Sequence, residues 1–151
     1  MVVTSVQRDI SAIKKSAEKM EAAQPAAIGT ASVGDVVRQG DLYLVCLDHL
    51  PEAAERVGKK LAPGETQGSR HVASGECAVY RPASATTVAQ LIGAVCRGAN
   101  IPEQLVGPLV ECLGETTIEH PEHGHRILPA GTVWAVVYQR AYGEEVRRVQ
   151  D

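Results

Sequence analysis

The N-terminal segment has the pattern of an amphipathic helix. Over residues 1–24, apolar positions recur at alternating spacings of three and four, which places them in one stripe along an α-helix. The stripe consists of Val3, Val6, Ile10, Ile13, Ala17 and Met20. Pro25 cannot continue a helix, so we expect the helix to end by residue 24. Because so short a stripe is not a stable coiled coil alone, it must pack on its own domain or against a partner.

The pattern changes after a short linker. Residues 25–34 are rich in Ala, Gly and Ser and predict a linker, and a second unit is expected over 35–151. In this unit, short apolar runs alternate with Gly- and Pro-containing turns, a pattern typical of strands. The clearest predicted strands are 42–47 and 133–138, and 71–80 is predicted as one bulged strand or two short ones.

Two further segments carry helical features. Residues 51–60 have a helical composition, which predicts one or two turns. Residues 86–97 have the apolar spacing of a helix, with Thr86 or Thr87 as its predicted N-cap. The fold prediction is therefore mainly β (α+β overall), a small antiparallel barrel or sandwich with an N-terminal amphipathic helix and one inserted helix.

Composition narrows the function classes. Hydrophobic residues make up 44% of the 151-residue chain, which is enough to build a core. The formal net charge of −3 makes a nucleic-acid partner unlikely on electrostatic grounds. No apolar run is long enough for a membrane helix, and charged residues interrupt the N-terminus where a signal peptide would need an apolar core. We therefore expect a cytoplasmic protein without a membrane partner.

The densest chemical feature is a group of histidines. Three of the five histidines lie between residues 119 and 125. Imidazole is the commonest side-chain ligand of transition metals, and carboxylates often accompany it. We take His71, His120 and His123 as candidate ligands of a divalent transition metal such as Zn, Fe, Ni or Mn. If the protein were an enzyme, Glu119 or Glu122 would be the residue that orients an imidazole or transfers a proton. The alternatives are a solvated turn with exposed histidines, or a pH-sensitive contact surface.

Several short motifs suggest a family. His-x-Glu-His-Gly at 120–124, Leu-Pro-x-Gly at 128–131 and Gln-Arg-x-Tyr at 139–142 are accompanied by Gln-Gly-Asp at 39–41. This combination resembles a family of small uncharacterised prokaryotic β-domain proteins. The resemblance implies no activity, and it favours His71, His120 and His123 over the other two histidines, His49 and His125.

A metal site within β structure is also similar to the cupins, which hold histidines and a carboxylate inside a β-barrel. The chain departs from the cupin pattern, because no Glu follows His123 and His125 at the required distance. The similarity to cupins is thus limited to composition and fold class.

Other catalytic motifs are missing from the sequence. It contains no Gly-x-Ser-x-Gly nucleophile motif and no glycine-rich nucleotide loop. The four cysteines form no Cys-x-x-Cys pair, and most of them lie in apolar runs typical of buried thiols. Two hypotheses follow. The preferred one is a non-enzymatic binding or assembly module that associates through the N-terminal helix, and the alternative is a metal-binding, cupin-like β protein or enzyme.

The assembly hypothesis makes a direct prediction. The full-length protein should form an oligomer, and a chain that lacks residues 1–27 should have the mass of a monomer, because its apolar stripe has been removed. Size-exclusion chromatography with light scattering measures both masses. Monomeric masses for both proteins would contradict the hypothesis.

Overall fold

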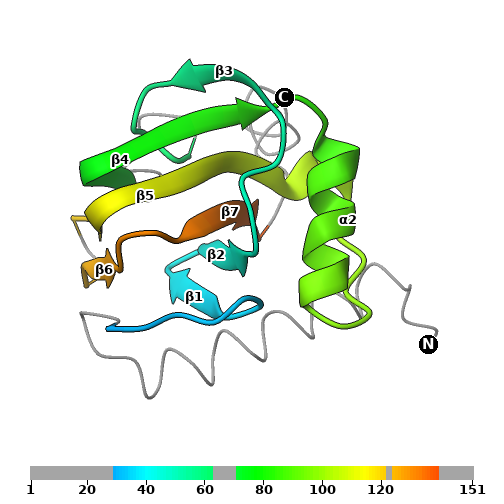
Figure 1. Ribbon diagram of the computed structural model, residues 1–151, viewed down its shortest axis with the longest axis horizontal. Helices are drawn as coiled ribbons and strands as arrows, with labels where there is room; N and C mark the ends of the chain where they lie inside the picture. The colour runs from blue at the N-terminus through cyan, green and yellow to red at the C-terminus, as the bar shows by residue number, and fades with distance from the viewer. Residues whose placement is uncertain (1–28, 63–70, 122–123, 140–151) are drawn as a thin grey trace, which may run out of the picture.

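The computed structural model describes residues 29–62, 71–121 and 124–139, and in these ranges the chain forms one antiparallel sheet and one α-helix (Figure 1). The sheet has seven strands. In chain order the elements are β1 (Val36–Gln39), β2 (Leu42–Leu47), β3 (Ala53–Val57), β4 (Val72–Pro82), α2 (Ala85–Val95), the 3₁₀ turn η2 (Glu103–Leu105), β5 (Val106–Glu119), β6 (Arg126–Leu128) and β7 (Val133–Tyr138). The mainly β prediction and the inserted helix are confirmed.

The sheet is open. Its strand order is β1-β2-β7-β5-β4-β3, and β1 and β3 remain at its two edges, so it does not close into the predicted barrel. The long strand β5 lies in the middle of the sheet and pairs with other strands along both of its sides. Along one side it pairs with β4, and along the other it pairs first with β7 and then with β6. Because β6 and β7 follow each other in the chain, they line β5 like one interrupted strand.

Both faces of the central strands are buried, which explains why β2 has no polar alternation. All six residues of β2 are buried. Leu42, Leu44 and Cys46 belong to one core cluster, which also contains Trp134. The intervening residues of β2 belong to a second cluster, which is covered by the helix α2. A strand that is covered on both faces has a continuous run of apolar residues in its sequence.

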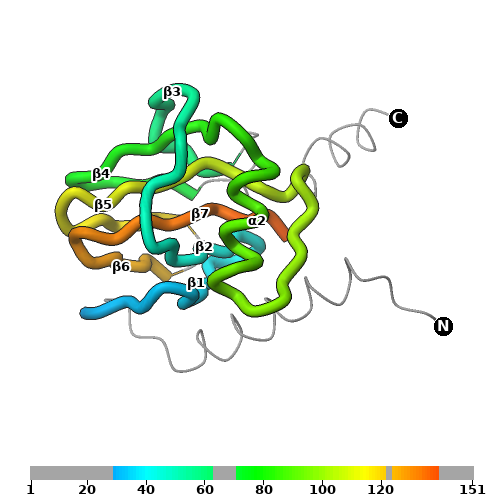
Figure 2. Tube along the Cα trace, turned by 45° about the vertical axis from the view of Figure 1, so that its right-hand side comes forward, coloured from blue at the N-terminus to red at the C-terminus, as the bar shows by residue number. Residues whose placement is uncertain are grey.

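The helix α2 lies across one face of the sheet, as the turned view in Figure 2 shows. Val88 and Ile92, one turn apart, are its buried residues. The hydroxyl of Ser84 caps the helix by accepting a hydrogen bond from the backbone N–H of Thr87. The predicted caps, Thr86 and Thr87, were wrong, since the helix begins at Ala85.

Tertiary pairing corrects one other prediction. Residues 53–57 form the edge strand β3 on β4 rather than helical turns, because the available ladder of β4 outweighs a weak helical composition. Residues 106–119 form one long strand, β5, which passes through Gly107 and Pro108 with an irregular register. The alternative of a single bulged strand around Gly75 is confirmed, because β4 is continuous and shifts register there.

The predicted N-terminal helix and its contact residues Val3, Val6, Ile10, Ile13 and Met20 lie outside the described residues. Within the described ranges, no helix has both the length and the apolar character needed to cross a membrane.

The cap of α2 gives a stability prediction. Replacing Ser84→Ala should lower the free energy of unfolding by about 1 kcal/mol, because the N–H of Thr87 loses its acceptor. Ser84→Asp should keep the stability, since a carboxylate also caps and favours the positive end of the helix. Urea unfolding of the three proteins measures this. Equal stability of Ser84→Ala and the parent protein would contradict the assigned cap.

Candidate functional site

Two histidines from distant parts of the sequence meet at one end of the sheet. His71 directly precedes β4 and His120 directly follows β5. Because Val72 pairs with Glu119 in the antiparallel ladder, residues 71 and 120 come next to each other. The two imidazole rings lie 4.4 Å apart between centroids, tilted by 46°. Both are buried, with exposed fractions of 0% for His71 and 4% for His120.

Gln39, at the end of β1, determines which ring nitrogen of His71 carries the hydrogen. Its side chain is fully buried, and its amide nitrogen donates hydrogen bonds of 2.9 Å to the carbonyl oxygens of Ile118 and Gly124. Carbonyl oxygens only accept, so this end of the amide must be the NH₂ group. The amide oxygen then faces Nδ1 of His71 at 2.8 Å. We conclude that His71 carries a hydrogen on Nδ1 and donates it to Gln39.

The other nitrogen of His71 faces a carboxylate. Nε2 lies 3.3 Å from Oδ1 of Asp41, which is the first residue after the β1–β2 turn glycine, Gly40. A neutral imidazole with its hydrogen on Nδ1 has only a lone pair on Nε2. Two acceptors would then point at each other. A positive charge between them, either a proton or a metal cation, removes the conflict.

The separation of Nε2 and Oδ1 can be compared with both arrangements. A charge-assisted N–H···O bond between an imidazolium and a carboxylate is normally about 2.7–2.9 Å long. Two ligand atoms bound at about 2.0–2.2 Å to one metal ion, at a near-tetrahedral angle, are instead about 3.3–3.6 Å apart. The observed distance of 3.3 Å lies close to this ligand separation and is also within hydrogen-bonding distance, so it is compatible with both arrangements.

Of His71 and Asp41, the residue whose side chain is exposed to solvent is Asp41. The side chain of His71 has no exposed surface, whereas that of Asp41 is 29% exposed. An ion or proton would therefore enter past the carboxylate of Asp41, while the imidazole is held from behind by Gln39.

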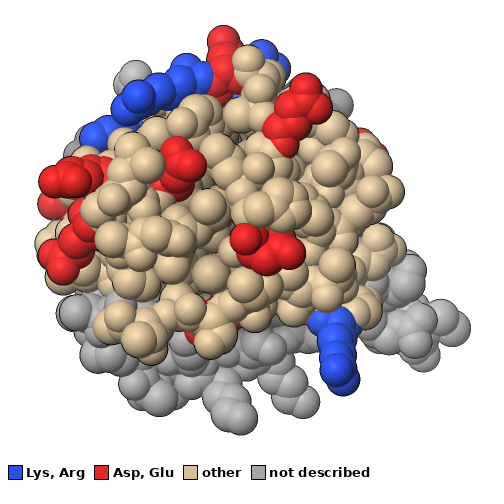
Figure 3. Space-filling model, viewed as in Figure 1, with Lys and Arg blue, Asp and Glu red and all other residues tan. Residues whose placement is uncertain are grey.

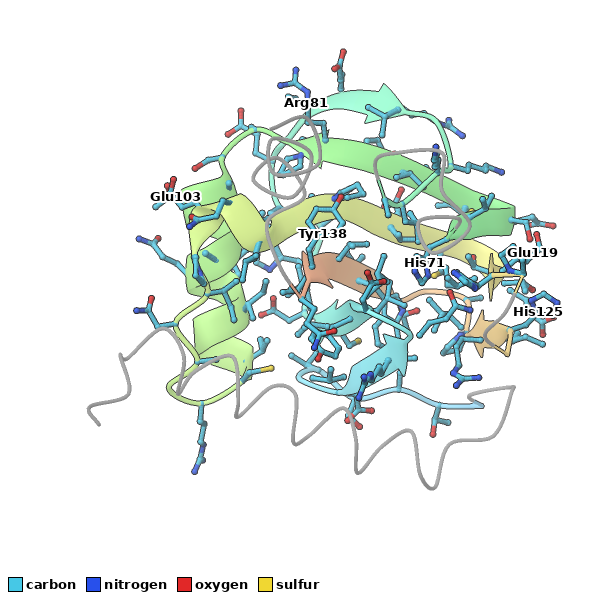
Figure 4. All side chains as sticks on the ribbon, turned by 180° about the vertical axis from the view of Figure 1, so that it is seen from behind. His71, Arg81, Glu103, Glu119, His125 and Tyr138 are labelled. Atoms are coloured by element: carbon cyan, nitrogen blue, oxygen red, sulfur yellow. The ribbon has the colours of Figure 1, made fainter. Side chains whose placement is uncertain are left out.

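The remaining predicted residues lie elsewhere. Glu119 is exposed because it alternates with buried Ile118 along β5, so its side chain points to the opposite face of the strand from His120. His125 is also exposed, and Figure 4 shows both side chains at the rim of the sheet, away from His71. His49 is exposed and pairs with neighbouring Asp48 at 2.6 Å. Glu122 and His123 lie outside the described residues.

Sequence reasoning missed the two residues that define the geometry. Gln39 and Asp41 entered only as part of the Gln-Gly-Asp motif, because nothing in the sequence shows that they approach a histidine some thirty residues later. The signal that could have identified them is a polar residue within the short apolar strand before the turn. Among the described residues, no group of three or more His, Cys, Asp or Glu side chains is arranged to hold a metal ion.

The surface offers a further observation. On the face shown in Figure 3, uncharged residues cover most of the centre, and blue Lys and Arg side chains gather at the upper edge with one more at the lower edge. The described residues visible on this face therefore form no broad basic surface.

Comparison with known proteins places this site in a family. The model of a domain of unknown function, DUF8820, matches residues 38–139, which is more than half of the chain. The chain belongs to the DUF8820 family. The matched span contains Gln39, Asp41, His71 and His120, so the whole cluster lies within the DUF8820 domain. The predicted relationship to an uncharacterised family is confirmed at this level. No curated protein and no solved structure matches the chain.

The role of Gln39 can be tested by stability. Gln39→Leu should lower the free energy of unfolding by at least about 2 kcal/mol, because buried Nδ1–H of His71 and the carbonyl of Ile118 both lose their partner. The matched control is Gln90→Leu on the exposed side of α2, which should change stability by no more than about 0.5 kcal/mol. Chemical denaturation measures both. Equal effects of the two substitutions would contradict the network.

Proposed function

We propose that the DUF8820 domain of this protein is a metal-binding module. It holds a divalent transition-metal ion between Nε2 of His71 and the carboxylate of Asp41. The observation that carries the proposal is the hydrogen bond from His71 Nδ1 to the oxygen of Gln39, which directs the lone pair of Nε2 at Asp41. Histidine ligands of metal ions are commonly oriented in this way, because the ring nitrogen that does not bind the metal donates a hydrogen bond to an oxygen.

The donor atoms indicate the class of ion. One imidazole nitrogen and one carboxylate oxygen suit Zn, Fe, Ni or Mn, the ions expected from the sequence. The ring of His120, which is also a predicted ligand, lies against that of His71 with 4.4 Å between the centroids. His123 remains a predicted further ligand. It directly precedes Gly124, whose carbonyl oxygen is bound to Gln39.

The arrangement supports binding more directly than catalysis. The imidazole of His71 has no exposed surface, so a substrate arriving from solvent would meet Asp41 first. An ion at this place would keep coordination positions only on the side of Asp41, which is partly exposed. Assembly through the N-terminal helix remains a separate prediction, which concerns residues outside the described ranges.

Titration with Zn²⁺ tests the proposal. The full-length protein, purified without a histidine tag, should bind about one equivalent of Zn²⁺ in calorimetry. Asp41→Asn should weaken binding at least about tenfold, since it removes the anionic ligand and leaves the shape of the side chain. Asp41 is partly exposed, so this variant should fold.

His49→Gln is the matched control, because His49 is an exposed histidine next to an aspartate but outside the cluster. Its affinity for Zn²⁺ should equal that of the parent protein. Binding of less than about a tenth of an equivalent would overturn the proposal, because protein zinc sites bind tightly. An unchanged affinity in Asp41→Asn would also overturn it.

A further inference from the structure

Two cysteines face each other across the middle of the sheet. Cys77 of β4 is the direct antiparallel partner of Cys112 of β5. Both are free thiols, with exposed fractions of 3% and 1%, and both belong to the core cluster around Trp134. Neither takes part in the histidine cluster, so the pair is independent of the proposed metal site.

The hydrogen bonds of Cys112 define how close the two residues are. Its N–H donates to the carbonyl of Thr132, and its carbonyl accepts from the N–H of Gly131, both on the side of β6 and β7. Both backbone groups of a strand residue point to the same side, so Cys112 makes no ladder bond toward β4. Such a non-hydrogen-bonded pair has Cα atoms about 4.5 Å apart, within the range of about 4.4–6.8 Å that a disulfide requires.

The ladder is interrupted directly beside this pair. Between the partners Gly75–Thr116 and Cys77–Cys112, one residue of β4 faces three residues of β5. The side chain of Glu76 lies over Gly114 in this bulge, where an added Cβ would meet its carboxylate at 2.7 Å. A bulge removes regular ladder bonds, which favours local opening that admits a small oxidant to the thiols.

We propose that Cys77 and Cys112 form a modification site, a cross-strand disulfide made by a peroxide. One thiolate attacks the peroxide oxygen, which gives a sulfenic acid and releases one water from hydrogen peroxide. The second thiol displaces the sulfenic oxygen as a second water and closes the S–S bond. The two sulfurs together lose two electrons and two protons, and hydrogen peroxide is reduced to two waters.

The chemical setting makes this reaction slow and selective. Burial raises the pKa of the Cys112 thiol, although side-chain hydrogen bonding with Thr116 and Thr132 opposes that rise. The thiolate is therefore a minor species, and general thiol reagents should react slowly.

The other cysteines cannot replace either partner. Cys46 lies in the same core cluster, but β7 separates its strand from β5. Two strand spacings amount to about 9.6 Å, beyond the limit of about 7 Å between the Cα atoms of a disulfide. Burial, followed by the nearby Asp35 and Cys112, raises the pKa of Cys46 to about 11, so it stays protonated. Cys96 follows α2 and packs in the other cluster.

Peptide mapping of the full-length protein tests the proposal. After exposure to hydrogen peroxide, free thiols are alkylated under denaturing conditions and the protein is digested without reductant. We expect one linked peptide containing Cys77 and Cys112, which dithiothreitol separates, and a melting temperature raised by about 5 °C because the closed loop restrains the unfolded chain.

Two variants provide the matched comparison. Cys46→Ala should still give the linked peptide, and Cys77→Ala should give neither the linked peptide nor the rise in melting temperature. Complete alkylation of Cys77 and Cys112 in the oxidised wild-type protein would overturn the proposal, whether or not the variants fold. A link through Cys46, or a lower melting temperature of the linked protein, would also overturn it.

Discussion

The antiparallel pairing of β4 with β5 is the constraint on which the rest of the structure depends. It brings His71 beside His120 at one end of the two strands and Cys77 opposite Cys112 near their middle. Residues far apart in the sequence become cross-strand neighbours about 5 Å apart only because this register is held. The remaining strands protect it: β7 and β6 cover the other side of β5, and β3 covers the other side of β4.

Gln39 connects this pair of strands to the opposite edge of the sheet. It lies in the edge strand β1, yet its amide nitrogen donates to one carbonyl within β5 and one after it, and its amide oxygen accepts from the ring of His71. One buried side chain therefore uses both ends of its amide, and by doing so it decides which nitrogen of His71 carries hydrogen. An apolar residue of the same size would fill the space but leave the buried ring nitrogen without an acceptor.

The elements that were predicted correctly are those whose structure is determined by the local residue pattern. The continuous apolar runs 42–47 and 133–138 are the central strands β2 and β7, and the spacing of Val88 and Ile92 marks α2. Prediction from the sequence failed where strand pairing determines the local structure. Residues 53–57 are an example, because their composition does not reveal that they pair with β4 at the edge of the sheet. In the site, histidine chemistry pointed to His71 and His120. Gln39 and Asp41 were missed because their approach to His71 depends on the path of the whole sheet.

The bulge in the pairing of β4 with β5 lies between the histidine pair and the cysteine pair. Its register shift explains how both pairs can face the same core. Residue numbers of paired positions sum to 191 from Val72–Glu119 to Gly75–Thr116, and to 189 from Cys77–Cys112 onward. A shift of two leaves the alternation of side chains unchanged, whereas a shift of one would turn every following residue to the other face. His71 and Cys77 therefore lie on one face of β4, as Cys112 and His120 do on β5. The insertion changes the register without moving either group out of the core.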